Sequence, residues 1–292
     1  MRKQILTLGI ILLFLCCSLS FTTVSDENNI NQDGKTLYVG GSGEGNYTKI
    51  QDAIDNASDD YTVFVCGGTY LENVIVDKSI VLVGEDRNST IIDGLNKGSV
   101  INVKVESVLI ENFTIRNGTS GIKSDPYKTS ISYNIITNND KGIESSYSEN
   151  VSIIGNIISK NNYGITCYRT EDSIIKDNHI LSNKIVGILF DLATIPGMGC
   201  KNNSVSYNII QKNSIGIYLS DSPSNNINYN NFYQNIVDAS FNSAFVGNDW
   251  NYNYWNRPRI LPKPIIGTIY YYIPWLNFDW FPAKEPHDIL VP

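Results

Sequence analysis

Hydrophobic and polar positions alternate in short segments that recur along most of this chain. Between residues 107 and 240, β-branched apolar segments of four to six residues are separated by Asn or Gly. Such segments are too short and too rich in Asn and Gly to form helices. The pattern therefore predicts short consecutive strands joined by tight turns.

The segments repeat with a period of 22 residues, apart from one copy that is longer by eight. A first Asn column comprises Asn112, Asn134, Asn156, Asn178, Asn208 and Asn230. A second column, five residues later, comprises Asn117, Asn139, Asn161, Asn183, Asn213 and Asn235. A fixed period of this length is typical of a solenoid, in which neighbouring copies bury each other's apolar faces.

The fold class expected from this repeat is all-β, a parallel β-helix with coils about 4.8 Å apart. Equivalent residues then lie above one another, so both Asn columns are expected to form ladders of amide hydrogen bonds along the axis. Asn also tolerates left-handed turn conformations. We interpret the two columns as structural rather than as ligand-binding.

The composition changes at both ends of the repeat. Thr48 is predicted to cap a short amphipathic helix that covers the first coil, and an aromatic, Pro-rich segment is predicted to cap the last coil. The predicted organisation is a signal peptide (1–25), an N-terminal cap with irregular first coils (26–106), regular repeats (107–240) and a C-terminal cap (241–292). The extra residues of the long copy, 193–201, predict a projecting loop that is a candidate binding feature.

The N-terminus has the pattern of a secretory signal, since Arg2 and Lys3 precede an apolar run and then small residues. No later apolar stretch is long enough for a transmembrane helix. We therefore expect a secreted or cell-surface protein without a membrane span. The net charge of −7 and the absence of any basic run disfavour nucleic acid as a partner.

Three Cys residues follow the predicted signal peptide, so the fold does not depend on a disulfide framework. Either Cys167 and Cys200 form one bridge, or both are buried free thiols.

Several motifs resemble one known family. Residues 50–54 (IQDAI), 68–74 (GTYLENV), 79–85 (SIVLVGE) and 90–94 (TIIDG), followed by the Asn repeats, are similar to the secreted NosD-like right-handed parallel β-helix proteins. The resemblance covers residues 36–256. It implies a right-handed β-helix of the type described as a carbohydrate-binding and sugar-hydrolysis domain, and the family's namesake takes part in copper supply to nitrous oxide reductase.

Our first functional hypothesis is binding of an extracellular glycan or a surface protein without catalysis. Tyr133, Tyr207 and Tyr229 each precede a first-column Asn and are expected to point to solvent, where aromatic rings suit sugars. Gly155 and Asp177 occupy the same position in the two intervening coils, so the tyrosines do not form one continuous stack. Ordinary β-favouring surface tyrosines are the alternative interpretation.

The alternative function is that of a polysaccharide lyase, hydrolase or epimerase. Acidic residues occur near one another in repeat phase, namely Asp125, Glu144, Asp172, Asp177 and Asp191. The motif set expected of polygalacturonases is absent, and residues 125–128 resemble an alginate-epimerase motif that has lost its His and Glu. Lys123 and Glu144 are interpreted as a cross-strand ion pair. Two exposed carboxylates and a basic residue in one groove would favour catalysis.

A second alternative is copper binding or delivery, for which His179, Met198 and Cys200 are the candidate ligands. No cofactor is expected otherwise, although calcium or copper stays open. Asn46, Asn56, Asn88, Asn150 and Asn202 are candidate glycosylation sites. Asn112 and Asn117 also lie in sequons, but a glycan would break the ladders, so both are expected to stay unmodified.

Overall fold

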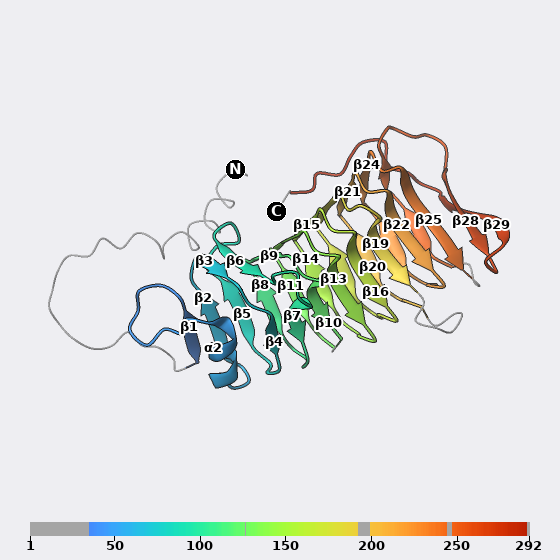
Figure 1. The fold of residues 1–292 in the computed structure, drawn as a ribbon. Coiled ribbons are helices and arrows are strands. Elements are labelled where there is room, and N and C mark those ends of the chain that lie inside the picture. Colours follow the sequence, from blue (N-terminus) through green and yellow to red (C-terminus); the bar gives the residue numbers. More distant parts are fainter. Residues whose placement is uncertain (1–34, 126, 192–198, 244–246, 291–292) are drawn as a thin grey trace, which may run out of the picture. The chain divides into compact units, whose positions relative to one another are not determined.

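The computed structural model describes residues 35–125, 127–191, 199–243 and 247–290. Residues 1–34 and most residues of the predicted 193–201 loop lie outside these ranges. The described residues form a parallel β-solenoid of about ten turns with one short helix (Figure 1). The expected fold class is therefore confirmed.

Each coil contributes one strand to each of three stacks, which we call A, B and C in the order in which the chain visits them. Stack A contains β1 (Thr36–Val39), β2 (Thr62–Val65), β5 (Val81–Gly84), β8 (Leu109–Glu111), β11 (Ser130–Ser132), β14 (Ser152–Ile154), β17 (Ile174–Lys176), β20 (Ser204–Ser206), β23 (Asn226–Asn228) and β26 (Asp249–Asn251). Stack B contains β3 (Gly68–Tyr70), β6 (Thr90–Asp93), β9 (Thr114–Arg116), β12 (Ile135–Thr137), β15 (Ile157–Ser159), β18 (His179–Leu181), β21 (Ile209–Gln211), β24 (Asn231–Tyr233) and β27 (Tyr254–Trp255). Stack C contains β4 (Val74–Val76), β7 (Ser99–Val103), β10 (Ser120–Ser124), β13 (Lys141–Ser146), β16 (Tyr163–Tyr168), β19 (Val186–Asp191), β22 (Ile215–Ser220), β25 (Val237–Ser243) and β28 (Lys263–Ile269).

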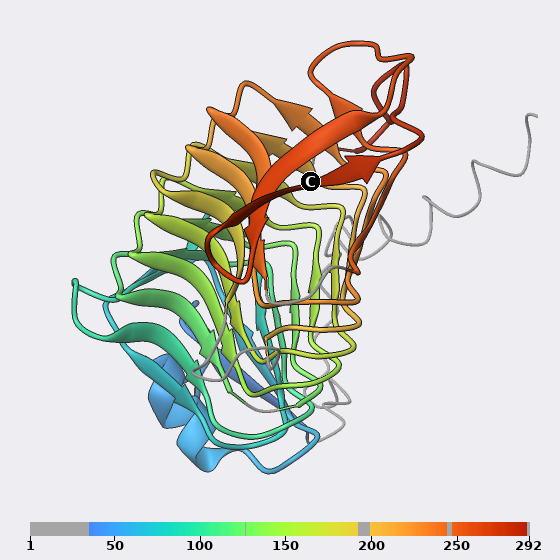
Figure 2. The ribbon, with the colours of Figure 1, turned by 90° about the vertical axis from the view of Figure 1, so that its right-hand side faces the viewer.

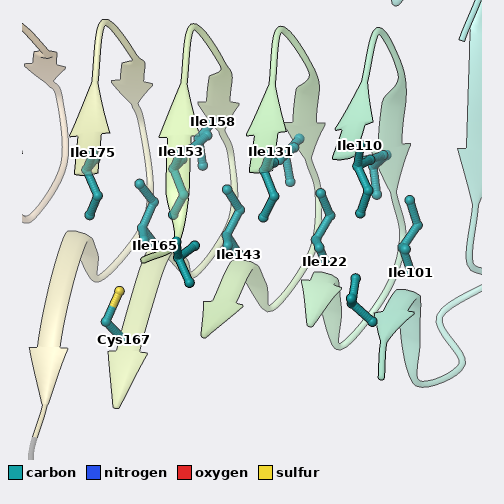
Figure 3. Packing of buried hydrophobic residues seen from close by; sticks show 14 of the residues in the cluster. Ile101, Ile110, Ile122, Ile131, Ile143, Ile153, Ile158, Ile165, Cys167 and Ile175 are labelled. Atoms are coloured by element: carbon teal, nitrogen blue, oxygen red, sulfur yellow. The ribbon is translucent and has the colours of Figure 1, made fainter. Parts of the chain in front are cut away.

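The core consists of apolar side chains that lie above one another from coil to coil. In stack A, Ile131, Ile153 and Ile175 are register partners and are buried, and Figure 3 shows this row beside the corresponding row of stack C. Burying each such side chain contributes about 1.5–3 kcal/mol. At the C-terminal end larger rings replace Ile, and Phe232 stacks on Trp255 with ring centroids 4.3 Å apart.

Buried Asn side chains connect the coils at the first corner, between stacks A and B. The backbone N and Nδ2 of Asn134 donate to Oδ1 of Asn156 at 3.0 and 3.1 Å, and Nδ2 also donates to the carbonyl of Ile110. The row contains Asn134, Asn156, Asn178, Asn208, Asn230 and Asn253. It ends at Asp279, whose Oδ2 accepts from N and Nδ2 of Asn253. A carboxylate suits this last position because it accepts without needing an acceptor of its own.

The second corner, between stacks B and C, has an equivalent row. It contains Asn139, Asn161, Asn183, Asn213 and Asn235. A third row, which was not predicted from the sequence, lies at the corner between stacks C and A. It contains Ser173, Asn203, Asn225 and Asn248.

Asn112 and Asn117 are not members of these rows, so their assignment to the ladders was wrong. The coil that contains them is one residue shorter than the next coils, because Ile110 pairs with Ile131 whereas Ile131 pairs with Ile153. Phe113 and Gly118 therefore take the row positions, and their backbone N–H groups donate to Asn134 and Asn139. The ladders consequently give no reason for either sequon to stay unmodified.

The left-handed residue at each corner is the one before the row Asn. Tyr133 has φ 55° and Lys160 has φ 56°, whereas the adjoining Asn134 and Asn161 have negative φ. Left-handed conformation is therefore not the reason for Asn in the rows. Side-chain hydrogen bonding provides that reason.

Both ends of the solenoid are covered (Figure 2). Helix α2 (Ile50–Asn56) buries Ile50 and Ile54, but its N-cap is Lys49 and no side chain caps it, so the predicted Thr48 cap was wrong. Instead, the Glu72 carboxylate accepts from the backbone N–H groups of residues 50 and 51, which satisfies the helix N-terminus.

At the other end, regular pairing continues beyond residue 240 to β27. The antiparallel strands β28 and β29 (Ile273–Asp279) then close the last coil, and Trp250 of β26 pairs with Asp279. The C-terminal cap is thus a β-hairpin followed by an extended tail.

Candidate functional site

The third corner, where each strand of stack C ends, holds a small open pocket that we call the strand-end pocket. Its volume is about 170 Å³, and it is lined by Tyr127, Tyr147, Ser148, Glu149, Arg169 and Glu171. These residues follow β10, β13 and β16 in three successive coils. The pocket therefore exists only because the coils stack in register.

Buried hydroxyl groups fix the backbone beneath this pocket. The Oγ atoms of Ser145 and Ser148 are 2.5 Å apart, and Oγ1 of Thr170 donates to the carbonyl of Ser145. In the following coils the same corner is held by the third Asn row instead. The pocket thus occupies the coils in which hydroxyl groups, including that of Ser173, hold the third corner in place of Asn side chains.

The pocket brings together an aromatic ring, a guanidinium and two carboxylates. The Arg169 guanidinium lies 5.3 Å from the Tyr147 ring centroid, and the Tyr147 side chain is 56% exposed. Glu149 and Glu171 are bridge partners on adjacent coils. Glu171 pairs with Lys201 at 3.2 Å, whereas neither Glu149 nor Arg169 forms an ion pair within the described part of the chain. A carboxylate and a guanidinium are therefore available to hydrogen-bond a polar ligand.

Next to the pocket, Lys141, Glu144 and Tyr168 lie on the outer face of stack C, and we call these three residues the outer strip. Lys141 Nζ lies 2.6 Å from Glu144 Oε1 and 5.2 Å from the Tyr168 ring centroid. Burial alone would lower the pKa of Lys141, but the hydrogen bond and charge of Glu144 outweigh it and raise that pKa. Burial alone would raise the pKa of Glu144, but hydrogen bonds from Lys141 and Ser120 lower it. Both groups are thus held in their charged forms.

The predicted ion pair between Lys123 and Glu144 is not formed. The two residues are register partners, as expected, but Lys123 pairs with Asp125 at 3.4 Å and Glu144 pairs with Lys141. The reason is that Lys141 lies on the same strand and outer face as Glu144, so it competes successfully for the carboxylate.

The structure brings Tyr207 and Tyr229 together but leaves Tyr133 apart. The first two rings stack with centroids 5.2 Å apart, and Tyr229 stacks in turn on Tyr252. Their faces therefore cover each other, and His287 packs against their edges. Tyr133 lies against Gly155 and lines a hollow of about 310 Å³ that the C-terminal residues 288–290 also line. Sugar binding by these three tyrosines stays a prediction.

The candidate metal ligands lie on different elements. His179 is on β18 in stack B, where its Nε2 is 2.5 Å from Nε2 of Gln211, and burial lowers its pKa. Cys200 is fully buried near the third corner, and its Sγ donates to the Cys167 carbonyl at 3.2 Å. Met198 lies outside the described residues. Within the described ranges, no group of three or more His, Cys, Asp or Glu is arranged to hold a metal ion.

Cys167 and Cys200 are buried free thiols, which is one of the two alternatives left open. Burial raises the pKa of Cys200 to about 12 and that of Cys167 well above its usual value. Both side chains are therefore protonated at neutral pH and are poor metal ligands in that form.

The candidate glycosylation sites are mostly at the surface. Asn56, Asn88, Asn150 and Asn202 are exposed, whereas Asn46 is half-buried and donates to the Gly40 carbonyl. Glycosylation at these positions stays a prediction.

The strand-end pocket was not predicted from the sequence. Five acids were considered as candidates, but not Glu149 and Glu171, which are 22 residues apart in repeat phase. Tyr147 and Arg169 have the same spacing. Aligning turn residues by repeat phase, rather than only the Asn columns, would have placed these four side chains on neighbouring coils.

Comparisons with known proteins support the fold. Residues 99–250 match the family model described as the right-handed beta helix region. A cell surface glycoprotein of Methanothermus fervidus is 38% identical over 96 residues, which is 32% of this chain and 15% of that protein. The chain thus spans only a small part of that relative.

Two solved structures share the fold at low identity. The A-module of mannuronan C-5 epimerase AlgE6 from Azotobacter vinelandii is 12% identical, with a TM-score of 0.53 over 72% of this chain and 73% of that one. The YbhC protein of Escherichia coli is 11% identical, with a TM-score of 0.50 over 77% and 76% of the two chains. Among the described residues of the present chain, no helix is long and apolar enough to cross a membrane.

Proposed function

Because the chain belongs to the right-handed β-helix family, we propose that it is an extracytoplasmic protein whose strand-end pocket binds a carbohydrate polymer without cleaving it. The observation that carries the proposal is the composition of this pocket. It combines two exposed tyrosines on consecutive coils with a carboxylate and a guanidinium that form no ion pair among the residues the structure describes.

Each part of the pocket suits a sugar. Sugar hydroxyl groups both donate and accept hydrogen bonds, so Glu149 can accept from them while Arg169 donates to them. The tyrosine rings supply apolar surface for the C–H faces of a sugar. The pocket is smaller than a typical enclosed ligand site and is open, which favours one unit of a chain lying across the surface over a buried small molecule.

The outer strip provides a continuation for a polymer. Tyr168 leads directly into Arg169, so the strip and the pocket meet at the end of β16. Coils about 4.8 Å apart place Lys123 and Glu144 at equivalent positions of adjacent strands, and this spacing of successive coils suits a repeating ligand. The similarity to a cell surface glycoprotein supports the proposed location outside the cytoplasm.

A second function, polysaccharide hydrolysis, is favoured by one observation. Glu149 and Glu171 are bridge partners on adjacent coils and line one pocket with Arg169. Two neighbouring carboxylates of this kind are the groups that glycoside hydrolysis requires. The pairing of Glu171 with Lys201 keeps that carboxylate occupied, and for this reason we rank binding first.

The test of binding is a glycan array probed with the purified secreted form and with two single variants. Tyr147→Ala is expected to lose most of the signal. Tyr133→Ala removes a tyrosine of similar exposure at another corner and is the matched control, so it is expected to bind normally. Absence of binding by every form, or equal binding by both variants, would contradict the proposed site.

Hydrolysis is tested on any polymer that the array identifies. Release of reducing ends by the unmodified protein, lost in both Glu149→Gln and Glu171→Gln, would establish the second function in place of the first. Binding without release of reducing ends is the result that we expect.

A further inference from the structure

The C-terminal end of the solenoid carries an exposed apolar patch next to cations. Ile260 is 89% exposed and Leu261 is 76% exposed, in the segment that connects β27 to β28. Trp280 and Phe281, which follow β29, are 60% and 62% exposed. We call these four residues the cap patch.

The hairpin register brings the two segments of the patch to one end of the hairpin. Lys263 at the start of β28 pairs with Asp279 at the end of β29. The chain before Lys263 and the chain after Asp279 therefore leave the same end of the hairpin, and the latter continues beside residues 252–253, where Phe281 stacks on Tyr252 with ring centroids 6.0 Å apart. Figures 1 and 2 place the hairpin at the end of the solenoid opposite α2.

The charge near Ile260 and Leu261 is positive. Residues 257–263 contain Arg257, Arg259 and Lys263 but no acidic residue, although the chain as a whole has a net charge of −7. Lys263 lies 3.8 Å from Asp238 and is partly neutralised. Arg257 and Arg259 form no ion pair within the described ranges. In the second segment, Lys284 is followed by Glu285, so these two charges offset each other.

This arrangement discriminates between possible occupants. Exposed aliphatic side chains beside unpaired arginines, with Trp at the edge, suit the interface of an anionic lipid bilayer, where apolar groups enter the acyl boundary and cations meet the headgroups. A two-fold contact between copies of this loop would bring like charges together. A sugar would leave the aliphatic side chains without apolar partners.

We propose that the cap patch docks the protein on the surface of an anionic membrane. Ile260 and Leu261 enter the interface, Trp280 and Phe281 lie at its boundary, and Arg257 and Arg259 contact phosphate groups. An apolar hollow on the same hairpin, lined by Ile266, Pro274, Trp275, Leu276 and Phe278, extends the apolar surface at this end. Docking by the end of the solenoid leaves the strand-end pocket uncovered.

The test is cosedimentation of the secreted form with vesicles. Vesicles of mixed phosphatidylcholine and phosphatidylglycerol are compared with vesicles of phosphatidylcholine alone, at low and high salt. We expect binding to the anionic vesicles that weakens with salt. The double variant Ile260→Asn with Leu261→Asn is expected to weaken binding to the anionic vesicles by a factor of about ten or more.

Two further variants show whether binding depends on the patch and on its charge. Ile236→Asn changes an isoleucine that is 84% exposed outside the patch, and it is expected to bind normally. Arg257→Gln is expected to weaken binding to anionic vesicles about fivefold, since one surface cation is removed. Unfolding midpoints of all variants confirm that each is folded.

Three results would overturn the proposal. These are no binding to anionic vesicles, equal binding to both kinds of vesicle, and a dimer in sedimentation that the double variant abolishes, which would assign the patch to self-association. None of them depends on whether the strand-end pocket binds a carbohydrate.

Discussion

The first and third corners of the solenoid are built differently. The first joins stack A to stack B within a coil, and the third joins stack C of one coil to stack A of the next. The first corner is short, as in residues 133–134, and a buried Asn in coil after coil donates to the next. The third corner is longer, as in residues 147–151, and in the pocket coils hydroxyl groups hold it. Tyr147, Glu149 and Arg169 project from it.

The difference shows how a repeat can stabilise the coil stacking at one corner while its residue types vary at another corner. At the first corner every buried amide needs its partner in the neighbouring coil, so no member can change alone without cost. At the pocket, solvent-facing side chains also join neighbouring coils, as in the Arg169–Tyr147 ring contact and the Glu171–Lys201 ion pair, but such surface contacts contribute little to stability. The solvent-facing side chains of the pocket can therefore change at less cost to stability than the buried row Asn residues of the first corner.

Replacing Asn156 by Ala tests the first corner with the largest expected effect. It removes the Oδ1 that accepts from N and Nδ2 of Asn134, and it removes the donor to Ile131. Leaving buried donors unpaired should lower the free energy of unfolding by about 3 kcal/mol or more. Urea unfolding measures this, with Glu149→Ala, an exposed residue of the third corner without positive φ, as the control. A similar loss in both variants would remove the distinction between the corners.

Replacing Gly164 by Ala tests how closely coils approach at the start of a stack C strand. A Cβ there would lie 2.4 Å from the backbone oxygen of Gly187 in the next coil, which cannot move independently. We expect a loss of about 1–3 kcal/mol in the free energy of unfolding. An unchanged midpoint in urea would mean that the coils can separate locally.

Asp279 tests the end of the first-corner row through pH. Burial raises its pKa, and hydrogen bonds from Trp255 and Asn253 only partly oppose this. The folded protein therefore binds this proton more tightly than the unfolded chain, and the contribution to stability is fully present below the usual carboxyl pKa. It is lost as pH rises through the raised pKa.

Asp279→Asn keeps an acceptor for Asn253 but does not titrate. Its free energy of unfolding should decline less than that of the unmodified protein between acidic and neutral pH, as measured by urea unfolding across this range. Parallel profiles would show that the carboxyl does not carry the expected charge penalty.

The smallest effect is expected at the second corner. Lys160 is exposed and has a left-handed backbone, φ 56°, which Gly adopts more easily. Lys160→Gly should raise the free energy of unfolding by about 0.5 kcal/mol, after the greater entropy of unfolded Gly is subtracted. Lys184→Gly, at an exposed position without positive φ, should lower it instead. Thermal unfolding of both variants distinguishes these opposite signs.

The repeat made most of the fold predictable, because the 22-residue spacing and the β-branched segments depend only on the residues themselves. Asn112 was misplaced because equal spacing in sequence does not reveal a coil that is one residue short. Only the strand register, with Ile110 opposite Ile131, shows this. Asn253 was missed for a similar reason, since it follows Asn230 after 23 residues.

The pocket was less predictable than the fold. Tyr147 and Arg169 occupy equivalent positions but share no chemistry, so a search for repeated residue types passes over them. Their proximity depends on the third corner folding alike in both coils, which buried Ser and Thr hydroxyl groups bring about. Those hydrogen bonds follow from packing and are not visible in residue spacing.

The division of roles between the corners is tested most directly by measuring carbohydrate binding and urea unfolding on the same samples of Tyr147→Ala and Tyr133→Ala. We predict that Tyr147→Ala, at the third corner, loses carbohydrate binding while its unfolding midpoint stays unchanged. We predict that Tyr133→Ala, at the first corner, keeps carbohydrate binding. Loss of binding in Tyr133→Ala with normal binding in Tyr147→Ala would contradict this division and move the site to the first corner.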